Sequence, residues 1–396
     1  MRVEYSDRVK KLPPYLFVEI DRAKKRALSE GKDIINLGIG DPDTPTPAPI
    51  IERLCHAAGD PKNHQYAMDA GMLELRRVIA AWYKERFGVD LNPETEVLPL
   101  IGSKEGIAHI PLAYVNPGDK VLVPEPGYPV YQASTWFAGG DVITMPLKEE
   151  HSYLPQFDAI NRDHLKHAKL MFLNYPNNPT GATAPLNFFE EAVAFAKEHN
   201  ICICHDAAYT EIYFDNNKPD SFLKAKDAKE VGIEFHSLSK TYNMTGWRIG
   251  FAVGNADMIK ALGIIKSNVD SGIFQAIQYA GIEAFNIDES QRVSMLRMYQ
   301  QRRDTLVNGL LEAGWSVASP QATFYVWARI PGMQDSRSFA LKLLSELGVV
   351  ATPGVGFGPS GEGYIRFALT VPSERIKEAI SRIRKLHAYP NSAAKQ

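Results

Sequence analysis

A lysine flanked by small hydroxyl side chains is the most chemically suggestive feature of this sequence. Lys240 closes the run Ser237-Leu238-Ser239-Lys240, and Arg248 follows eight residues later. A lysine amine can form a Schiff base with an aldehyde cofactor, while two hydroxyls and a guanidinium fork can hold a phosphate dianion. Most lysines are solvated surface charges, but here an apolar, strand-like segment leads into the lysine. The run therefore predicts a covalent amine beside a phosphate clamp.

A second turn could also meet a phosphate. Gly102-Ser103-Lys104 follows the apolar segment Val97–Ile101 and opens a helical pattern. Gly102 permits a tight turn, and Ser103 with the first helix amides can bind an anion at the positive end of the helix dipole. An ordinary serine N-cap accounts for the same residues. Taken alone, the turn leaves both interpretations open.

Further polar side chains stand at or near the ends of apolar segments. Asp206 ends one such segment, where a carboxylate is costly unless a cation pairs with it. Arg366 lies inside the apolar run Tyr364–Ala368, where a bound carboxylate would satisfy its guanidinium through two hydrogen bonds. Asn178, before Pro179, is an amide held in one orientation. The plainer alternatives are a capping aspartate and a loop asparagine.

These motifs, in this order and spacing, resemble the class I/II aminotransferases of fold type I over roughly residues 30 to 385. The wording Gly-Ser-Lys-Glu-Gly-Ile from Gly102 is similar to the LL-diaminopimelate aminotransferase branch of that family. The resemblance implies pyridoxal 5'-phosphate as cofactor. It also implies two half-reactions with ping-pong kinetics, in which Lys240 moves the α-proton of the substrate.

The resemblance assigns roles to the motif residues. It implies catalytic roles for Lys240, Asp206 and Tyr128, with Asp206 pairing the pyridine nitrogen and Tyr128 lying flat on the ring. The remaining residues implied to bind the cofactor are Tyr66, Gly102, Ser103, Lys104, Asn178, Tyr209, Ser237, Ser239 and Arg248. Residues implied to contact substrate are Tyr15, Gly40, Asp69, Lys104, Asn178, Asn268 and Arg366, the last gripping the α-carboxylate. Tyr66 matches a tyrosine that reaches the phosphate of the neighbouring subunit, so a homodimer with shared active sites is expected.

The amine donor is inferred from the residues around the expected distal pocket. The segment 249–291 contains no arginine, whereas dicarboxylate-specialised relatives usually place a second arginine there. Asp69 and Glu105 could instead face a distal ammonium. We therefore expect LL-2,6-diaminopimelate as donor and 2-oxoglutarate as acceptor, in lysine biosynthesis. Alanine, aspartate or aromatic aminotransferase activity, or a C–S lyase on the same fold, are the alternatives. A DNA-binding regulator would need a basic helix-turn-helix domain, which the sequence lacks.

The elements that must position these residues alternate between strand and helix. Strand-like segments are expected at 97–101, 120–123, 142–145, 170–174, 201–205, 234–238 and 249–253, with a helix at Leu186–His199. This order predicts an α/β fold whose largely parallel seven-stranded sheet is sandwiched by helices, with ligands outside the carboxyl ends of its strands. We expect an N-terminal arm at 1–48, a large cofactor-binding domain at 49–286 and a small α+β domain at 287–396. Within the last, a helix is expected near 289–313.

Bulk properties limit the partners. The chain has 396 residues, 23% of them charged, and a net charge of −2, which favours neither nucleic acid nor membrane as partner. No stretch has the roughly 18 apolar residues of a membrane helix, and the N-terminus does not resemble a signal peptide. Three cysteines favour a reducing cytoplasm. Cys202 and Cys204 alternate as in a buried strand, so no metal site is expected.

Overall fold

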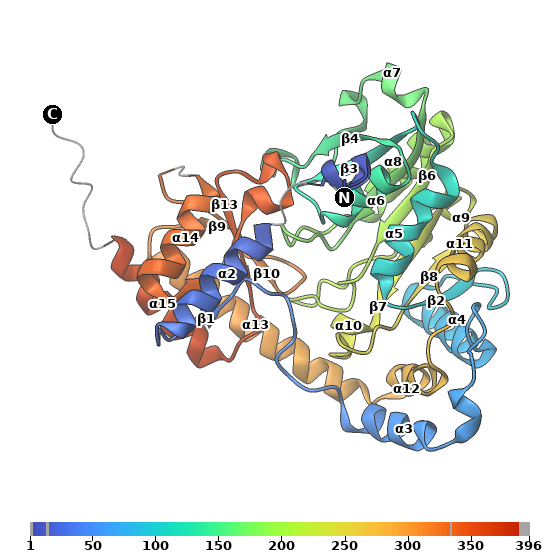
Figure 1. Cartoon of the computed structure of the whole chain (residues 1–396), viewed down its shortest axis with the longest axis horizontal. Coiled ribbons are helices and arrows are strands. Elements are labelled where there is room, and N and C mark those ends of the chain that lie inside the picture. Colours follow the sequence, from blue (N-terminus) through green and yellow to red (C-terminus); the bar gives the residue numbers. More distant parts are fainter. Residues whose placement is uncertain (1–2, 13–15, 333–334, 388–396) are drawn as a thin grey trace.

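A seven-stranded sheet forms the centre of the larger part of the molecule, on the right in Figure 1, in the computed structural model, which describes residues 3–12, 16–332 and 335–387. The strand order is β2-β8-β7-β6-β5-β3-β4, and β8 runs in the direction opposite to the other six strands. The bounds are β2 (Val97–Leu100), β3 (Lys120–Glu125), β4 (Asp141–Pro146), β5 (Ala168–Asn174), β6 (Cys202–Asp206), β7 (Gly232–Ser237) and β8 (Gly250–Gly254). The predicted α/β class and largely parallel sheet are confirmed.

Helices cover both faces of this sheet, as its nearly continuous apolar strands require. Alternate residues of β5 separate the two faces: Leu170 and Phe172 pack into one core cluster, and Met171 and Leu173 into the other. The first face is covered by α5 (Ser103–Tyr114), α6 (Val130–Phe137) and α11 (Ala256–Val269). The second is covered by α4 (Leu73–Phe87), α8 (Leu186–His199) and α12 (Gln275–Asn286), with α3 (Ala48–Ala58) packed on α12.

The helix ends follow local sequence signals. Helix α8 has the predicted bounds and ends at Asn200, whose φ of 54° is left-handed. Helix α4 ends at Gly88 with φ 73°. A left-handed residue after the last turn is a common way for a helix to stop, and Gly and Asn adopt that conformation at least cost. The long helix α13 (Glu289–Glu312) ends one residue before its predicted bound.

A second, smaller group of elements packs around its own core. Its antiparallel sheet has the order β12-β13-β10-β9, and a two-stranded parallel sheet joins β1 to β11. The strands are β1 (Ile35–Asn36), β9 (Ser316–Val317), β10 (Tyr325–Arg329), β11 (Val349–Val350), β12 (Thr352–Pro353) and β13 (Tyr364–Ala368); the helices are α2 (Leu16–Ser29), α13, α14 (Ser336–Leu347) and α15 (Ser373–His387). The domain boundaries at 48 and 286 stay a prediction.

The described chain also has four short α-helices: α1 (Asp7–Lys10), α7 (Arg162–Leu165), α9 (Ala228–Val231) and α10 (Leu238–Thr241). Its 3-10 helices are η1 (Pro61–His64), η2 (Glu149–His151), η3 (Phe157–Ala159), η4 (Phe222–Lys224), η5 (Gly354–Phe357) and η6 (Pro359–Gly361). Helix α10 directly continues β7 and carries the lysine that the sequence singled out. Over the described ranges, none of the helices combines the length and apolar character that a membrane crossing needs.

Candidate active site

A cavity of about 710 Å³ lies beyond the carboxyl ends of the parallel strands, between the large sheet and the smaller group of elements. This is where open α/β sheets bind ligands. The predicted residues that line it are Gly40, Ser103, Lys104, Tyr128, Asn178, Asp206, Tyr209, Ser237, Ser239, Lys240, Arg248 and Arg366. Motifs separated by more than a hundred residues thus meet in one hollow.

The Lys240 amine lies in this cavity, partly buried and close to backbone. Its Nζ donates to the carbonyl oxygen of Gly40 at 2.9 Å and lies 5.6 Å from the centre of the Phe324 ring. Burial lowers the pKa of Lys240 to about 8, assisted by the positive charges of Arg248 and Arg366 and opposed by Asp41. A lysine with a depressed pKa has an unprotonated fraction near neutral pH, and this is the form that attacks a carbonyl.

Serine, glycine and arginine form a cradle next to Lys240. Gly102 precedes α5 with φ 74°, and a Cβ there would collide with the guanidinium of Arg248. Ser237 Oγ accepts from the amide of Ser239, whose own buried hydroxyl has no partner among the residues described. Arg248 donates to the Thr245 carbonyl at 3.0 Å. A positive group, an unsatisfied hydroxyl and a helix N-terminus together suit an anion such as a phosphate.

One oxygen of the Asp206 carboxylate is left without a donor. Oδ2 accepts from the Tyr131 hydroxyl at 2.7 Å, whereas Oδ1 is buried with no partner in the described part of the chain. Burial raises the pKa of Asp206, and the Tyr131 bond and the nearby His205 and His236 counteract that rise. A buried oxygen is normally hydrogen-bonded. The protonated pyridine nitrogen of pyridoxal 5'-phosphate has the charge and the donor to satisfy Oδ1.

Arg366 is buried and surrounded by neutral acceptors. Its Nη1 donates to Asn178 Oδ1 and its Nη2 to the carbonyl of Gly38, each at 2.8 Å. The guanidinium lies over the rings of Tyr325 and Phe357 at 4.0 and 4.7 Å. None of these contacts supplies a negative charge, and a buried cation is costly without one. A carboxylate entering the cavity would provide it.

Two of the predicted tyrosines, Tyr128 and Tyr209, also line the cavity. The Tyr209 hydroxyl lies 3.1 Å from that of Tyr325. The Tyr128 ring packs edge-on against the ring of Tyr131, 5.8 Å between centres. Tyr131 and Tyr325 were missed by the sequence reasoning. Tyr131 lies in the first turn of α6, three residues after Tyr128, which precedes the helix, and nothing local marks Tyr325.

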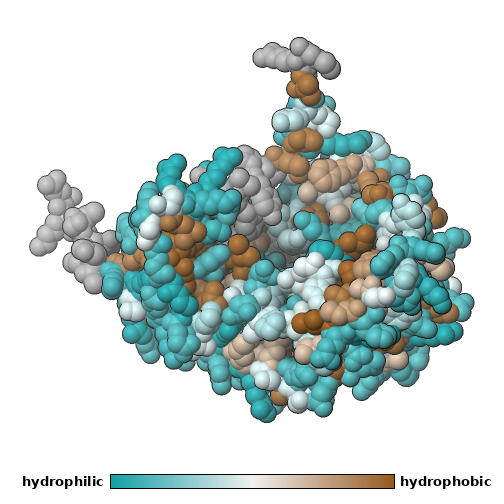
Figure 2. All heavy atoms as spheres, turned by 60° about the horizontal axis from the view of Figure 1, so that its bottom comes forward, coloured by the Kyte–Doolittle hydropathy of each residue, from teal (hydrophilic) through white to brown (hydrophobic). Residues whose placement is uncertain are grey.

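Besides Gly102, which directly precedes the lining residue Ser103, three predicted residues in the described part of the chain do not line the cavity. Tyr66 is 95% exposed, Asp69 is half-buried, and exposed Asn268 donates to the Ile264 carbonyl of its own helix. Tyr15 lies outside the described residues. Figure 2, which brings the bottom of Figure 1 forward, shows hydrophobic side chains gathered in patches among hydrophilic ones.

Glu105 does not have the surroundings that the sequence analysis expected. Its carboxylate accepts from the buried ammonium of Lys266 at 2.8 Å and from the amide of Ile101, and it is not among the residues lining the cavity. The expectation that Glu105 faces a distal ammonium of the substrate is therefore wrong. The partner lysine lies 161 positions away in the sequence, so no local pattern indicated this pairing.

Comparison with known proteins places these features in a family. A family model described as aminotransferase class I and II matches residues 32–383. The LL-diaminopimelate aminotransferase of Syntrophobacter fumaroxidans is 57% identical over 381 residues, which cover 96% of this chain and 98% of the relative. That of Halothermothrix orenii is 54% identical over 382 residues, with the same coverage of both chains.

Solved structures are similar over nearly the whole length. The substrate-bound structure of BacF from Bacillus subtilis has a TM-score of 0.93 and 44% identity, covering 98% of both chains. A single mutant of Thermus thermophilus aspartate aminotransferase has a TM-score of 0.91 and 29% identity, covering 98% of this chain and all (100%) of that one.

Proposed function

This chain belongs to the class I and II aminotransferases, and we propose that it transfers the amino group of LL-2,6-diaminopimelate to 2-oxoglutarate, giving tetrahydrodipicolinate and glutamate. The resemblance predicted from the motifs is thereby confirmed, and the family cofactor is pyridoxal 5'-phosphate. The choice of donor rests on one observation: relatives that match almost end to end at 52–57% identity carry the name LL-diaminopimelate aminotransferase. Lysine biosynthesis is the corresponding role, and the cytoplasm is the proposed compartment.

The residues of the cavity suit this cofactor. Asp206 Oδ1 and the Ser239 hydroxyl have no hydrogen-bond partner among the described residues, and the cofactor would supply one to each. The space that Gly102 leaves beside Arg248 would accommodate it. The phosphate is proposed to lie against Gly102, Ser103, Lys104, Ser237, Ser239 and Arg248; the ring against Tyr128, Asn178, Asp206 and Tyr209. When bound, the cofactor supplies an aldehyde that combines with amines and a ring that accepts negative charge.

The protein's own groups bind the substrate and move its proton. Arg366 is proposed to hold the α-carboxylate, Asp206 to keep a proton on the pyridine nitrogen, and Lys240 Nζ to take the proton from the α-carbon. The lowered pKa of Lys240 suits a base working near neutral pH. Because donor and acceptor both need Arg366, they must occupy the site in turn, and we expect ping-pong kinetics.

A homodimer with shared sites is part of the proposal. Large apolar side chains are exposed on one connected surface, comprising Tyr66, Met68, Val269 and Phe274. The backbone of Gly272 packs against that of Met68, and the rings of His64 and Phe274 lie 6.1 Å apart, which connects the two segments. Such a surface is typical of an interface. Tyr66, Asp69 and Asn268 would then face the partner's cavity, Tyr66 its phosphate and the other two its substrate.

A donor-by-acceptor screen tests the function. We expect kcat/KM with 2-oxoglutarate to be higher for LL-diaminopimelate than for alanine, aspartate or tyrosine, and meso-diaminopimelate is measured beside them as the stereochemical comparison. A distal ammonium paired with a carboxylate discriminates strongly against donors that lack it. If alanine, aspartate or tyrosine were favoured about tenfold, roughly 1.4 kcal/mol in transition-state binding, the proposed donor would be wrong. Pyruvate release from cystathionine would instead indicate a C–S lyase.

A further inference from the structure

Lys266 is a fully buried lysine whose three ammonium hydrogens all have acceptors. Its Nζ donates to Glu105 Oε1 at 2.8 Å, to Asp270 Oδ1 at 2.9 Å and to the Ser271 carbonyl at 3.0 Å. Its side chain is 0% exposed and that of Glu105 is 7% exposed. Removing one member of such a buried pair leaves the other charge without compensation, which is strongly unfavourable. The bridge therefore holds three segments in one arrangement.

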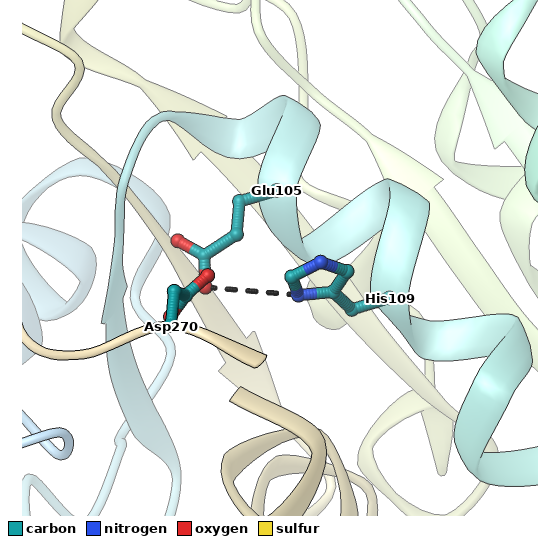
Figure 3. A group of neighbouring side chains, drawn as sticks. All are labelled: Glu105, His109 and Asp270. Atoms are coloured by element: carbon teal, nitrogen blue, oxygen red, sulfur yellow. Dashed lines mark ion pairs between the residues drawn. The ribbon is translucent and has the colours of Figure 1, made fainter. Parts of the chain in front are cut away.

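The surroundings of Lys266 resemble a metal site but already contain a cation. Glu105, His109 and Asp270 converge from α5 and the end of α11 (Figure 3), with ligand atoms within 4.8 Å of one another. His109 Nδ1 lies 3.9 Å from Glu105 Oε1. The ammonium of Lys266 bonds to both carboxylates, so it supplies the positive charge that the two acids need.

The Glu105 side of the bridge contacts the anion cradle of the same chain. The second carboxylate oxygen of Glu105 accepts the amide hydrogen of Ile101. Ile101 directly precedes Gly102 and Ser103, which begin α5 beside Arg248. Because a Cβ at position 102 would already collide with Arg248, a small shift of this turn changes the space between the turn and the guanidinium. The Lys266–Glu105 pair thus fixes the carboxyl end of β2, directly next to the residues that form the cradle.

The Asp270 side of the bridge leads to the exposed segment that carries Tyr66. Asp270 and Ser271 lead into Gly272, where a Cβ would collide with the carbonyl oxygen of Met68 and lie 2.9 Å from that of Ala67. Two backbones are therefore in direct contact, and the position of residues 270–272 determines that of residues 67–68. Tyr66 projects from this segment into solvent.

We propose that Lys266 is a positioning residue for two cofactor phosphates. Through Glu105 it sets the cradle of its own subunit, and through Asp270 and Gly272 it sets the Tyr66 segment offered to the neighbouring subunit. The inference rests on the proposed function in one respect, namely that Gly102, Ser103 and the partner's Tyr66 hold the phosphate. It does not depend on which amino acid is the donor.

Cofactor release from the holoenzyme of Lys266→Met tests this role, with Lys260→Met on the exposed side of the same helix as control. We expect the dissociation constant for pyridoxal 5'-phosphate to rise about tenfold, the scale of a lost charge-assisted hydrogen bond. The dissociation constant for pyridoxal, which has no phosphate, should change far less. An equal rise in both dissociation constants would contradict the proposal, because Lys266 would then have only a general structural role. An unchanged dissociation constant for pyridoxal 5'-phosphate would also overturn it.

Two milder substitutions test the Glu105 contact and the Asp270 contact separately, and they can be used if Lys266→Met does not fold. Glu105→Gln and Asp270→Asn are placed in mixed dimers in which one subunit is Lys240→Ala, so that visible absorbance reports the single site that retains Lys240. Glu105→Gln should weaken cofactor binding when it is on the subunit with Lys240, and Asp270→Asn when it is on the other subunit. The same loss of cofactor binding in either placement would refute the separate roles of Glu105 and Asp270. Failure to form mixed dimers would contradict the shared site of the proposed function, while the phosphate-dependent effect of Glu105→Gln would still be measurable.

Discussion

The Tyr131 hydroxyl donates to one carboxylate oxygen of Asp206 at 2.7 Å, and the other oxygen has no hydrogen-bond partner among the described residues. Tyr131 is fully buried, and its ring stacks on Phe172 at 5.0 Å. The hydroxyl therefore has a fixed position. It restricts Asp206 to one orientation and stabilises the charged form of its carboxylate.

Tyr131→Phe should raise the pKa of Asp206 further, because burial already raises it and the substitution removes a donor to the carboxylate. The acid limb of the kcat–pH profile should move to higher pH. The lost hydrogen bond should also lower kcat by about fivefold to tenfold, roughly 1 kcal/mol. Matching acid limbs for variant and wild type would show that Tyr131 does not act through Asp206.

Asp206→Asn should impair chemistry much more than cofactor binding. The amide cannot stabilise a protonated pyridine nitrogen, so the ring accepts less negative charge. We expect kcat to fall by about a hundredfold or more, the scale for removing one preorganised electrostatic partner. Single-turnover absorbance changes measure the chemical step directly. Asp163→Asn, at a surface position paired with Lys166, is the control, and turnover equal to that of the control would remove Asp206 from this role.

Arg366→Lys should weaken amino-acid binding while leaving the bound cofactor in place. Lysine keeps the positive charge but loses the fork that bonds a carboxylate at two points. The KM for every amino-acid donor should rise by about tenfold or more, because a charge-assisted hydrogen bond is lost. Steady-state kinetics measure this, with the visible spectrum of the holoenzyme as the check on the cofactor. An unchanged KM for all donors is incompatible with carboxylate binding by Arg366.

Tyr66 should act on the partner's site. Mixing Lys240→Ala protein with Tyr66→Phe protein should give dimers in which one site carries both changes and the other carries neither. Activity should then rise above that of either parent after subunit exchange. Differently tagged subunits report whether exchange is complete. If exchange is complete and Tyr66→Phe alone is impaired, but activity does not rise, the shared site is contradicted.

Loss of the buried Glu234 carboxylate should strongly lower the free energy of unfolding. Glu234 accepts from His205 Nδ1 at 2.8 Å, from His236 Nε2 at 2.7 Å and from the Tyr83 hydroxyl. Glu234→Gln should lower the free energy of unfolding by about 3–5 kcal/mol, the usual cost of breaking a buried pair. Glu230→Gln, in an exposed pair with Lys197, should cost about 0–1 kcal/mol. Urea unfolding compares them, and equal midpoints would contradict the prediction.

The effect of Glu234 should also depend on pH. Burial opposes ionisation, but the hydrogen bonds and charges of His205 and His236 prevail and hold the pKa of Glu234 well below its ordinary value of 4.5. A group whose pKa is lowered by folding stabilises the protein above its unfolded pKa, and that stability is lost as the pH falls. The difference between wild type and Glu234→Gln should therefore shrink below about pH 4.5. A constant difference between pH 7 and pH 3 would be inconsistent with an ionised Glu234.

Local sequence patterns were sufficient for the strands of the large sheet and for the motifs at their ends. Apolar runs of five or six residues specify a buried strand, and the turn or helix start that follows depends on nearby residues. The positions of Lys240, Asp206 and Ser103 relative to strand ends could therefore be read along the chain. The topology of parallel sheets then brings those ends to one edge, so most of the cavity could be predicted without coordinates.

Pairings between distant residues were decided by the tertiary structure. Asn178 and Arg366 lie 188 positions apart, and Glu105 and Lys266 lie 161 apart, yet each pair is hydrogen-bonded. The sequence placed Glu105 in the substrate pocket because its charge suited a distal ammonium, whereas the fold gives that charge to a buried lysine. Charge alone specifies what a side chain can bind, but which partner it meets depends on how helices pack over the sheet, and this follows from the burial of many side chains together.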